Sequence, residues 1–145
     1  MKRKISLFTL FIILALAGQV YADTQRFGNY VVNVPSGWRG ELQGQTLVVK
    51  SESVNASVAV AFAEMGEASF TDIVERLYIQ MKGENLEQDE DGDYTFTFKN
   101  LAGGESLAMI SGDDGYYLVL SITGYDDDEV QEDLEAIIDS LDYEE

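Results

Sequence analysis

The sequence contains neither cysteine nor histidine among its 145 residues. The missing cysteine excludes disulfides and thiolate nucleophiles, and the missing histidine excludes a Ser-His pair and histidine-ligated zinc. Basic residues are also scarce, since nine Lys and Arg stand against 27 Asp and Glu, for a net charge of −18. Such a charge repels nucleic acid and anionic lipid. The composition therefore predicts a protein that is not an enzyme and does not bind nucleic acid.

The first 22 residues have the pattern of a secretory signal peptide. The basic segment Lys2–Lys4 precedes the 13-residue apolar run Ile5–Ala17, and Val20 and Ala22 occupy the −3 and −1 positions of a cleavage site. The alternative, an uncleaved membrane anchor, needs about 20 apolar residues. We therefore expect cleavage after Ala22, export to the periplasm or the medium, and a single domain over residues 23–145.

Gln19 bears on whether a lipid could anchor the exported chain to a membrane. Leu16-Ala17-Gly18 has the order of a lipoprotein signal before its cysteine, but Gln19 occupies the cysteine position, so no lipid can be attached there. Removal of residues 1–22 would take away three bases and no acid, which changes the net charge from −18 to −21. No stable membrane anchor is expected after cleavage.

Hydrophobic periodicity predicts several strands and two principal helices. Tyr94, Phe96 and Phe98 alternate with polar residues, as in a strand with one buried face, and Ser69 with Asp72 resembles a capping box that starts a helix. The expected strands are Tyr30–Val34, Thr46–Lys50, Ser57–Phe62, Tyr94–Lys99, Ser106–Ser111 and Tyr116–Thr123. The expected helices are Ser69–Gly83, with its apolar face at Phe70, Ile73, Val74, Leu77 and Met81, and Asp126–Leu141.

Two of these strands are apolar at consecutive positions, which indicates that both of their faces are covered. They are Val58–Phe62 and Leu107–Ile110, and both contain alanines that would let a helix lie close. Asp113-Asp114-Gly115 is typical of a hairpin turn. The order of the elements predicts an α+β domain with a mainly antiparallel sheet and two principal helices packed on it.

The layout resembles a known group of proteins. The strand that ends in Val34-Pro35-Ser36-Gly37-Trp38, the helix that begins Ser69-Phe70, the aromatic hairpin strand Gly115–Ser121 and the closing helix that ends Ile137–Leu141 follow the order of PsbP-like proteins and the related DcrB-like exported proteins. The resemblance implies an α/β/α sandwich around an antiparallel sheet. It also implies an accessory or binding protein that is not an enzyme.

Three aromatic residues are candidate contacts for a ligand or partner. Trp38 follows a Pro-Ser-Gly turn, and Tyr116 and Tyr117 point to opposite faces of their strand, so one of the two faces the less buried side. Surface aromatics can line a binding cleft. The alternative is structural: Trp38 closes one end of the sandwich and the tyrosines border the core.

Two acidic clusters are candidate metal ligands. Asp89, Asp91 and Asp93 surround Gly92, but an EF-hand register would place Phe98 at the position that requires a bidentate carboxylate. A polar turn is the alternative there, and a noncanonical Ca²⁺ site stays open. The second cluster precedes the last helix, where acids also complement the helix dipole. Its residues are Asp126, Asp127 and Asp128.

These observations predict an exported accessory or binding domain without enzymatic activity and without a cofactor. Its partner would be a protein or a small ligand that is neutral or basic, because the chain itself is strongly acidic. The alternative function is an acidic Ca²⁺-binding exported protein that uses the aspartate clusters.

Overall fold

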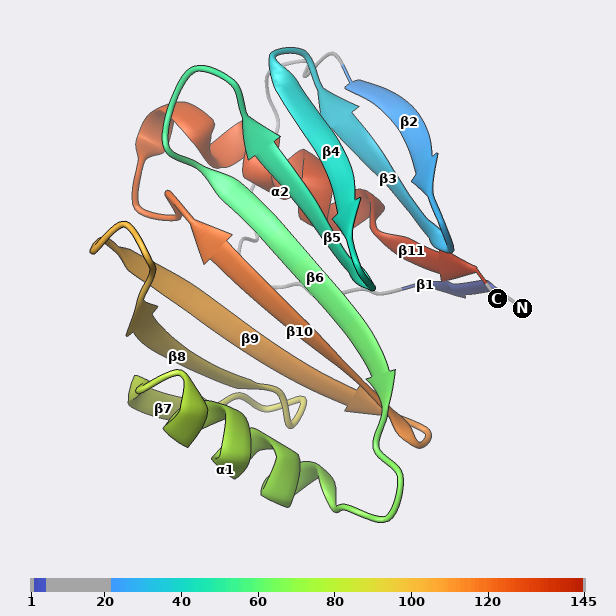
Figure 1. Cartoon of the computed structure of the whole chain (residues 1–145), viewed down its shortest axis with the longest axis vertical. Helices are drawn as coiled ribbons and strands as arrows, with labels where there is room; N and C mark the ends of the chain where they lie inside the picture. Colours follow the sequence, from blue (N-terminus) through green and yellow to red (C-terminus); the bar gives the residue numbers. More distant parts are fainter. Residues whose placement is uncertain (1, 5–21, 145) are drawn as a thin grey trace. The chain divides into compact units, whose positions relative to one another are not determined.

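The computed structural model describes residues 2–4 and 22–144 (Figure 1). The apolar run Ile5–Ala17, on which the expected signal peptide rests, lies outside the described residues, and so does Gln19, the residue at the position of a lipoprotein cysteine. The chain divides into two compact units. The first consists of Met1–Val58 and Gly124–Glu145, and the second of Ala59–Thr123.

The first unit contains a four-stranded sheet, a separate hairpin and a helix. The sheet has the strand order β1-β11-β3-β2, and its pairs are antiparallel. Strand β4 pairs with β5, also antiparallel. The elements are β1 (Lys2–Lys4), β2 (Ala22–Phe27), β3 (Tyr30–Pro35), β4 (Trp38–Gln43), β5 (Thr46–Ser51), the 3₁₀ turn η2 (Asp128–Val130), α2 (Gln131–Ser140) and β11 (Asp142–Glu144).

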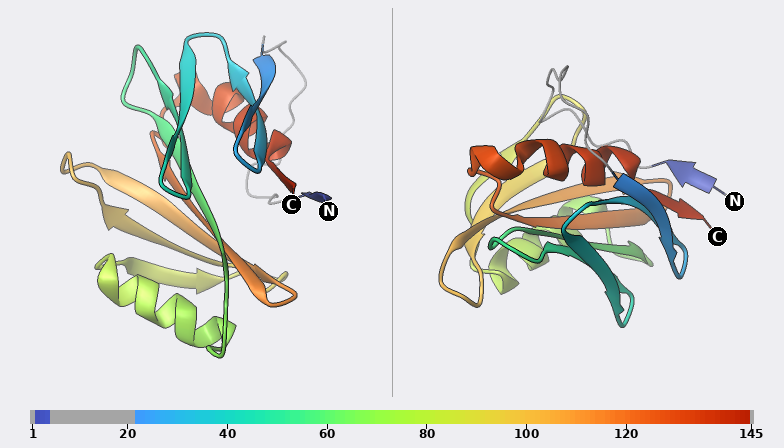
Figure 2. Two further views of the ribbon diagram at one scale, coloured as in Figure 1. Left: turned by 45° about the vertical axis from the view of Figure 1, so that its right-hand side comes forward. Right: turned by 90° about the horizontal axis from the view of Figure 1, so that it is seen from above.

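Strand β3 and helix α2 form the centre of the first unit (Figure 2). Alternate residues of β3 are buried, since Tyr30, Val32 and Val34 point to one face. The apolar stripe of α2 is buried as well, and the backbone N–H of Asn33 donates to Ser140 Oγ at 2.8 Å. Helix α2 therefore lies along β3.

The second unit is a sheet covered by one helix. Its strands follow the order β6-β10-β9-β8-β7, and β6 begins in the first unit. Val74 of the helix packs in one cluster with Phe96, Ala108 and Ile110 of the strands. The elements are β6 (Ser57–Glu64), α1 (Phe70–Gln80), β7 (Glu84–Gln88), β8 (Tyr94–Lys99), β9 (Glu105–Asp113) and β10 (Tyr116–Thr123).

Helix α1 begins as the sequence predicts. Ser69 is the N-cap, and its Oγ accepts from the N–H of Asp72 at 3.1 Å. At the other end, Lys82 has a φ of 54°, and the N–H of Gly83 donates to the carbonyl of Tyr78 at 2.8 Å. The predicted apolar face is confirmed, because its five residues are buried or pack against the buried cluster.

The hairpin between β9 and β10 is also confirmed. Asp113 pairs with Tyr116, and the two residues between them, Asp114 and Gly115, both have positive φ (51° and 85°), as a type I′ turn requires. In β9 consecutive apolar residues are buried on both faces, as expected. In β6 the expectation is met on one face only, since Ala59 and Ala61 are half-buried.

The mainly antiparallel α+β architecture with two helices agrees with the predicted fold class. The strands β1, β2, β4, β7 and β11 were not expected from the sequence. No helix within residues 2–4 and 22–144 is long and apolar enough to cross a membrane.

Candidate functional site

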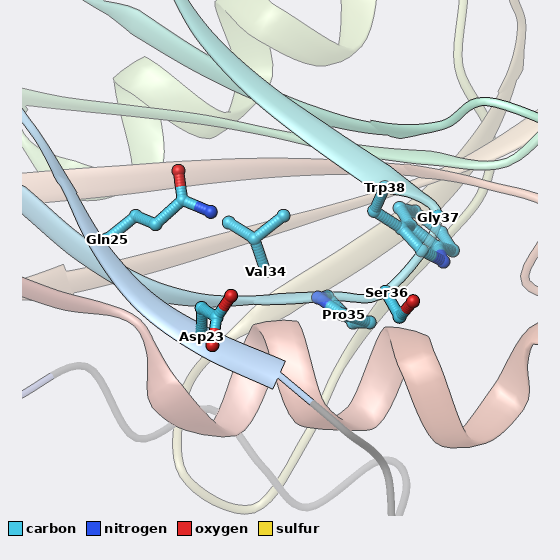
Figure 3. Close-up of a pocket in the computed structure, with 7 residues that line it drawn as sticks. All are labelled: Asp23, Gln25, Val34, Pro35, Ser36, Gly37 and Trp38. Atoms are coloured by element: carbon cyan, nitrogen blue, oxygen red, sulfur yellow. The ribbon is translucent and has the colours of Figure 1, made fainter.

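A pocket of about 360 Å³ opens in the first unit, where β3 ends and β4 begins (Figure 3). Its lining divides into two parts. The apolar wall consists of three buried residues, Val34, Pro35 and Trp38. The polar rim consists of three exposed side chains, those of Asp23, Gln25 and Ser36, and the backbone of Gly37 completes the lining.

The local sequence explains why a hollow forms at this point. Pro35 ends β3, because proline has no N–H for a further ladder bond. The chain then turns through Ser36 and Gly37, whose φ of 83° favours glycine. The carbonyl of Gly37 accepts from the N–H of Glu52 at 2.9 Å, so this turn is held in place. Trp38 then begins β4 directly beside the end of β3.

Trp38 belongs to the core and to the pocket. Only 7% of its surface is exposed, and its Nε1–H donates to Asp133 Oδ2 at 2.8 Å. Asp133 lies in the first turn of α2, so the indole joins the turn after β3 to the helix. This placement agrees with the structural alternative of a buried plug. A contact with a ligand stays a prediction for the part of the ring that lines the pocket.

Strand β2 supplies the acidic part of the rim. Asp23 pairs with Val34, and Gln25 pairs with Val32, so both rim residues lie on one face of the strand. Thr24, on the opposite face, donates to Asn33 Oδ1 at 2.6 Å. The seven lining residues include one carboxylate and no basic side chain. The electrostatic character of the rim is therefore negative.

Tyr116 and Tyr117 lie in the second unit and do not line this pocket. The ring of Tyr116 stacks on that of Phe62, with centroids 5.1 Å apart and planes at 11°. Tyr117 is half-buried and pairs with Gly112 of β9. Their predicted role as partner contacts is independent of the pocket.

The loop of Asp89, Asp91 and Asp93 is held by its own carboxylates. Asp89 Oδ1 accepts from the N–H groups of Asp91 and Asp93 at 2.9 and 3.0 Å. Ser111 Oγ donates to Asp93 Oδ1 at 2.7 Å. Burial raises the pKa of Asp93, and the hydrogen bond from Ser111 opposes this rise. The negative charges of Asp89 and Asp91 raise the pKa further. These are the contacts of a polar turn between β7 and β8.

The second acidic cluster begins the last helical segment. Asp127 is the N-cap of η2, and its carboxylate accepts from the N–H of Glu129 at 2.9 Å. Asp126 and Asp128 are exposed. Within the part of the chain that the structure describes, no three acidic side chains are placed to hold a metal ion together.

Sequence reasoning found one residue of the pocket, Trp38, and missed six. Four of the six, Val34 to Gly37, lie in the segment that suggested the family resemblance, but their side chains carry little chemistry of their own. Asp23 and Gln25 come from a strand that the sequence does not reveal. The signal that could have drawn attention to this site is the turn Pro35–Gly37 next to the only tryptophan.

No family model and no curated protein sequence matches this chain. The fold has a solved counterpart in the solution structure of cyanobacterial PsbP (CyanoP) from Synechocystis. The match covers 89% of this chain and 96% of that chain, with a TM-score of 0.53 and 17% sequence identity. The chain therefore has a PsbP-like fold, which confirms the predicted resemblance at the level of the fold.

Proposed function

We propose that this protein is an exported binding domain without enzymatic activity, which receives a neutral or basic group of a small ligand or of a partner protein in the pocket beside Trp38. The pocket carries the proposal. It places the side chains of three buried residues beside several polar groups, and both kinds of group can contact a ligand. Its volume of about 360 Å³ also falls in the range of ligand sites.

The pocket chemistry favours binding over catalysis. Ser36 is the one hydroxyl on the rim, and the lining contains no lysine or histidine that could take its proton. Asp23 is the one carboxylate, so the pocket also lacks an acid–base pair. The PsbP-like fold agrees with an accessory role, although a fold alone does not define a function.

Export would place the pocket near the new end of the chain. The proposed cleavage after Ala22 removes β1 and leaves Asp23 as the first residue of β2. Asp23 and Gln25 then remain paired with β3, so the rim is kept. The protein for binding experiments should therefore be the form recovered from the exported fraction, with its mass compared with that of residues 23–145.

The single tryptophan makes the site observable. Occupancy of the pocket should change the fluorescence of Trp38, because the ligand replaces water at the indole. Replacement of Trp38 itself is a poor test, since removal of a buried aromatic costs about 3–5 kcal/mol of stability. Gln25→Phe is better, because an aromatic suits an exposed strand position and its ring would fill the mouth.

Gln43→Phe is the matched control, since Gln43 is also an exposed strand residue of the first unit but does not line the pocket. Both variants should have equal melting temperatures. Gln25→Phe should then lose the fluorescence response to small amines and alcohols, and lose partner capture from the exported fraction, while Gln43→Phe keeps both. Equal binding by the two variants would show that the pocket is not the binding site.

A further inference from the structure

We infer that the group bound in this pocket is a cation on an aliphatic stem, an ammonium or a guanidinium. The inference rests on the proposed function and goes beyond it by assigning the ligand charge. Its first support is the distribution of charge around the site. Asp23 is on the rim, and Asp133 Oδ2 lies 2.8 Å from the indole nitrogen of Trp38. One carboxylate thus lines the pocket, and a second contacts the aromatic residue of its wall.

The basic residues nearest in sequence do not offset these carboxylates. Arg26 of β2 is engaged elsewhere, because it pairs with Glu144 at 2.5 Å and donates to the carbonyl of Gly28 at 3.2 Å. Arg39 follows Trp38 in β4, so its side chain points to the opposite face of the strand. In a chain that begins at Asp23, the α-ammonium adds one positive charge, which is fewer than the two carboxylates.

The hydrogen bond of Trp38 decides which part of the indole can meet a ligand. Its one donor is used by Asp133, so the ring offers carbon atoms and π electrons to the pocket. A carboxylate that accepts the N–H also increases the electron density of the ring. An aromatic surface of this kind attracts ammonium and guanidinium groups.

The apolar wall accounts for the stem. Val34 and Pro35 are buried, and their side chains contain only carbon and hydrogen. An alkyl chain gains from contact with them, while Asp23, Gln25 and Ser36 on the rim bind the charged end. The net charge of −18 draws cations toward the molecule in general. The pocket would bind one kind of cation by its shape, whereas the acidic surface attracts all counterions without selection.

Three probes with one six-carbon stem test the sign of the charge: hexylamine, hexanol and hexanoate. Each is titrated into the exported protein while the fluorescence of Trp38 is followed. Hexylamine should bind on the order of tenfold more tightly than hexanol, and hexanoate most weakly. Added NaCl should weaken hexylamine alone, because only its binding depends on an opposite charge.

Substitutions test whether Asp23 is the carboxylate that attracts the cation. Asp23→Asn should weaken hexylamine several-fold and leave hexanol unchanged, while Asp126→Asn, which removes an exposed acid outside the pocket, should alter neither. Hexanol bound as tightly as hexylamine would overturn the cation inference and leave the binding pocket intact. No response to any probe, together with partner capture that Gln25→Phe does not impair, would instead overturn the proposed function.

A further pair of probes separates the two sources of such a cation. Cadaverine represents a free small amine, and the peptide Ala-Ala-Lys-Ala-Ala represents a side chain of a partner protein. A clear preference for the peptide would support a protein partner, and a preference for cadaverine a small ligand. Failure of both to bind more tightly than hexanol would again contradict the inference.

Discussion

Asp93 ends the loop between β7 and β8, where its carboxylate accepts a hydrogen bond from Ser111. Burial raises the pKa of this carboxyl above its ordinary value of 3.8, while the Ser111 contact opposes the shift and the charges of Asp89 and Asp91 increase it. The folded protein therefore binds a proton at Asp93 more readily than the unfolded chain does. At neutral pH the ionised side chain thus lowers the free energy of unfolding.

Asp93→Asn should accordingly raise the free energy of unfolding at pH 7, because the neutral amide removes the buried charge and still accepts from Ser111. The gain should shrink as the pH falls through the raised folded pKa of Asp93, and it should vanish below 3.8, where the wild-type side chain is neutral in both states. Urea unfolding at pH 7, 5, 4 and 3 measures the difference. A gain that is independent of pH would mean that the amide acts through packing.

Trp38 shows at the same scale how far a residue can be interpreted from the sequence. Its position after a turn predicts a special role, but the sequence does not distinguish an exposed contact from a buried plug. The decisive fact is a hydrogen bond to Asp133, 95 positions away in the chain. Such a partner depends on how α2 lies along β3, and no local pattern of residues encodes that arrangement.

At the scale of elements, the sequence predicts the strands and helices that bury an apolar face in the core. β8 alternates aromatic and polar residues, every second residue along most of β3 and β10 is buried, and α1 has a cap and an apolar face. The strands β4 and β7 were missed for the opposite reason. Each is an edge strand that is mostly polar and exposed, so backbone pairing rather than side-chain burial makes it a strand.

The start of α1 provides a test at this scale. Ser69→Ala removes the acceptor of the Asp72 N–H and should lower the free energy of unfolding by about 0.5–2 kcal/mol. Ser69→Asp should retain most of the stability, because aspartate also caps and its charge suits the helix N-terminus. Urea denaturation of the three proteins measures this order. Equal losses in both variants would show that the hydroxyl acts through some contact other than the cap.

At the scale of the whole molecule, the surplus of acids is the dominant feature. With a net charge of −18, the acidic residues repel one another, and this repulsion favours the unfolded chain. Some of the clustered acids nevertheless have structural roles. Asp89 holds a turn and Asp127 caps η2, so two of the six carboxylates predicted as metal ligands accept backbone hydrogen bonds.

The Ca²⁺-binding alternative can therefore be tested against the simpler expectation that salts act only by screening the acidic charges. CaCl₂, MgCl₂ and NaCl should all raise the melting temperature, because each screens the repulsion among the acids. The two divalent salts at equal ionic strength should do so to the same extent. A specific Ca²⁺ site would add about 2.7 kcal/mol at a concentration 100 times its dissociation constant.

Thermal melts in the three salts, each repeated with EDTA, make the comparison. An additional shift with Ca²⁺ alone would contradict the expectation and restore the alternative function. Asp91→Asn and Asp126→Asn would then assign the site, since each removes one carboxylate from a different cluster and neither side chain accepts a hydrogen bond described above. Loss of the additional shift in one variant and its retention in the other would identify the cluster that binds the ion.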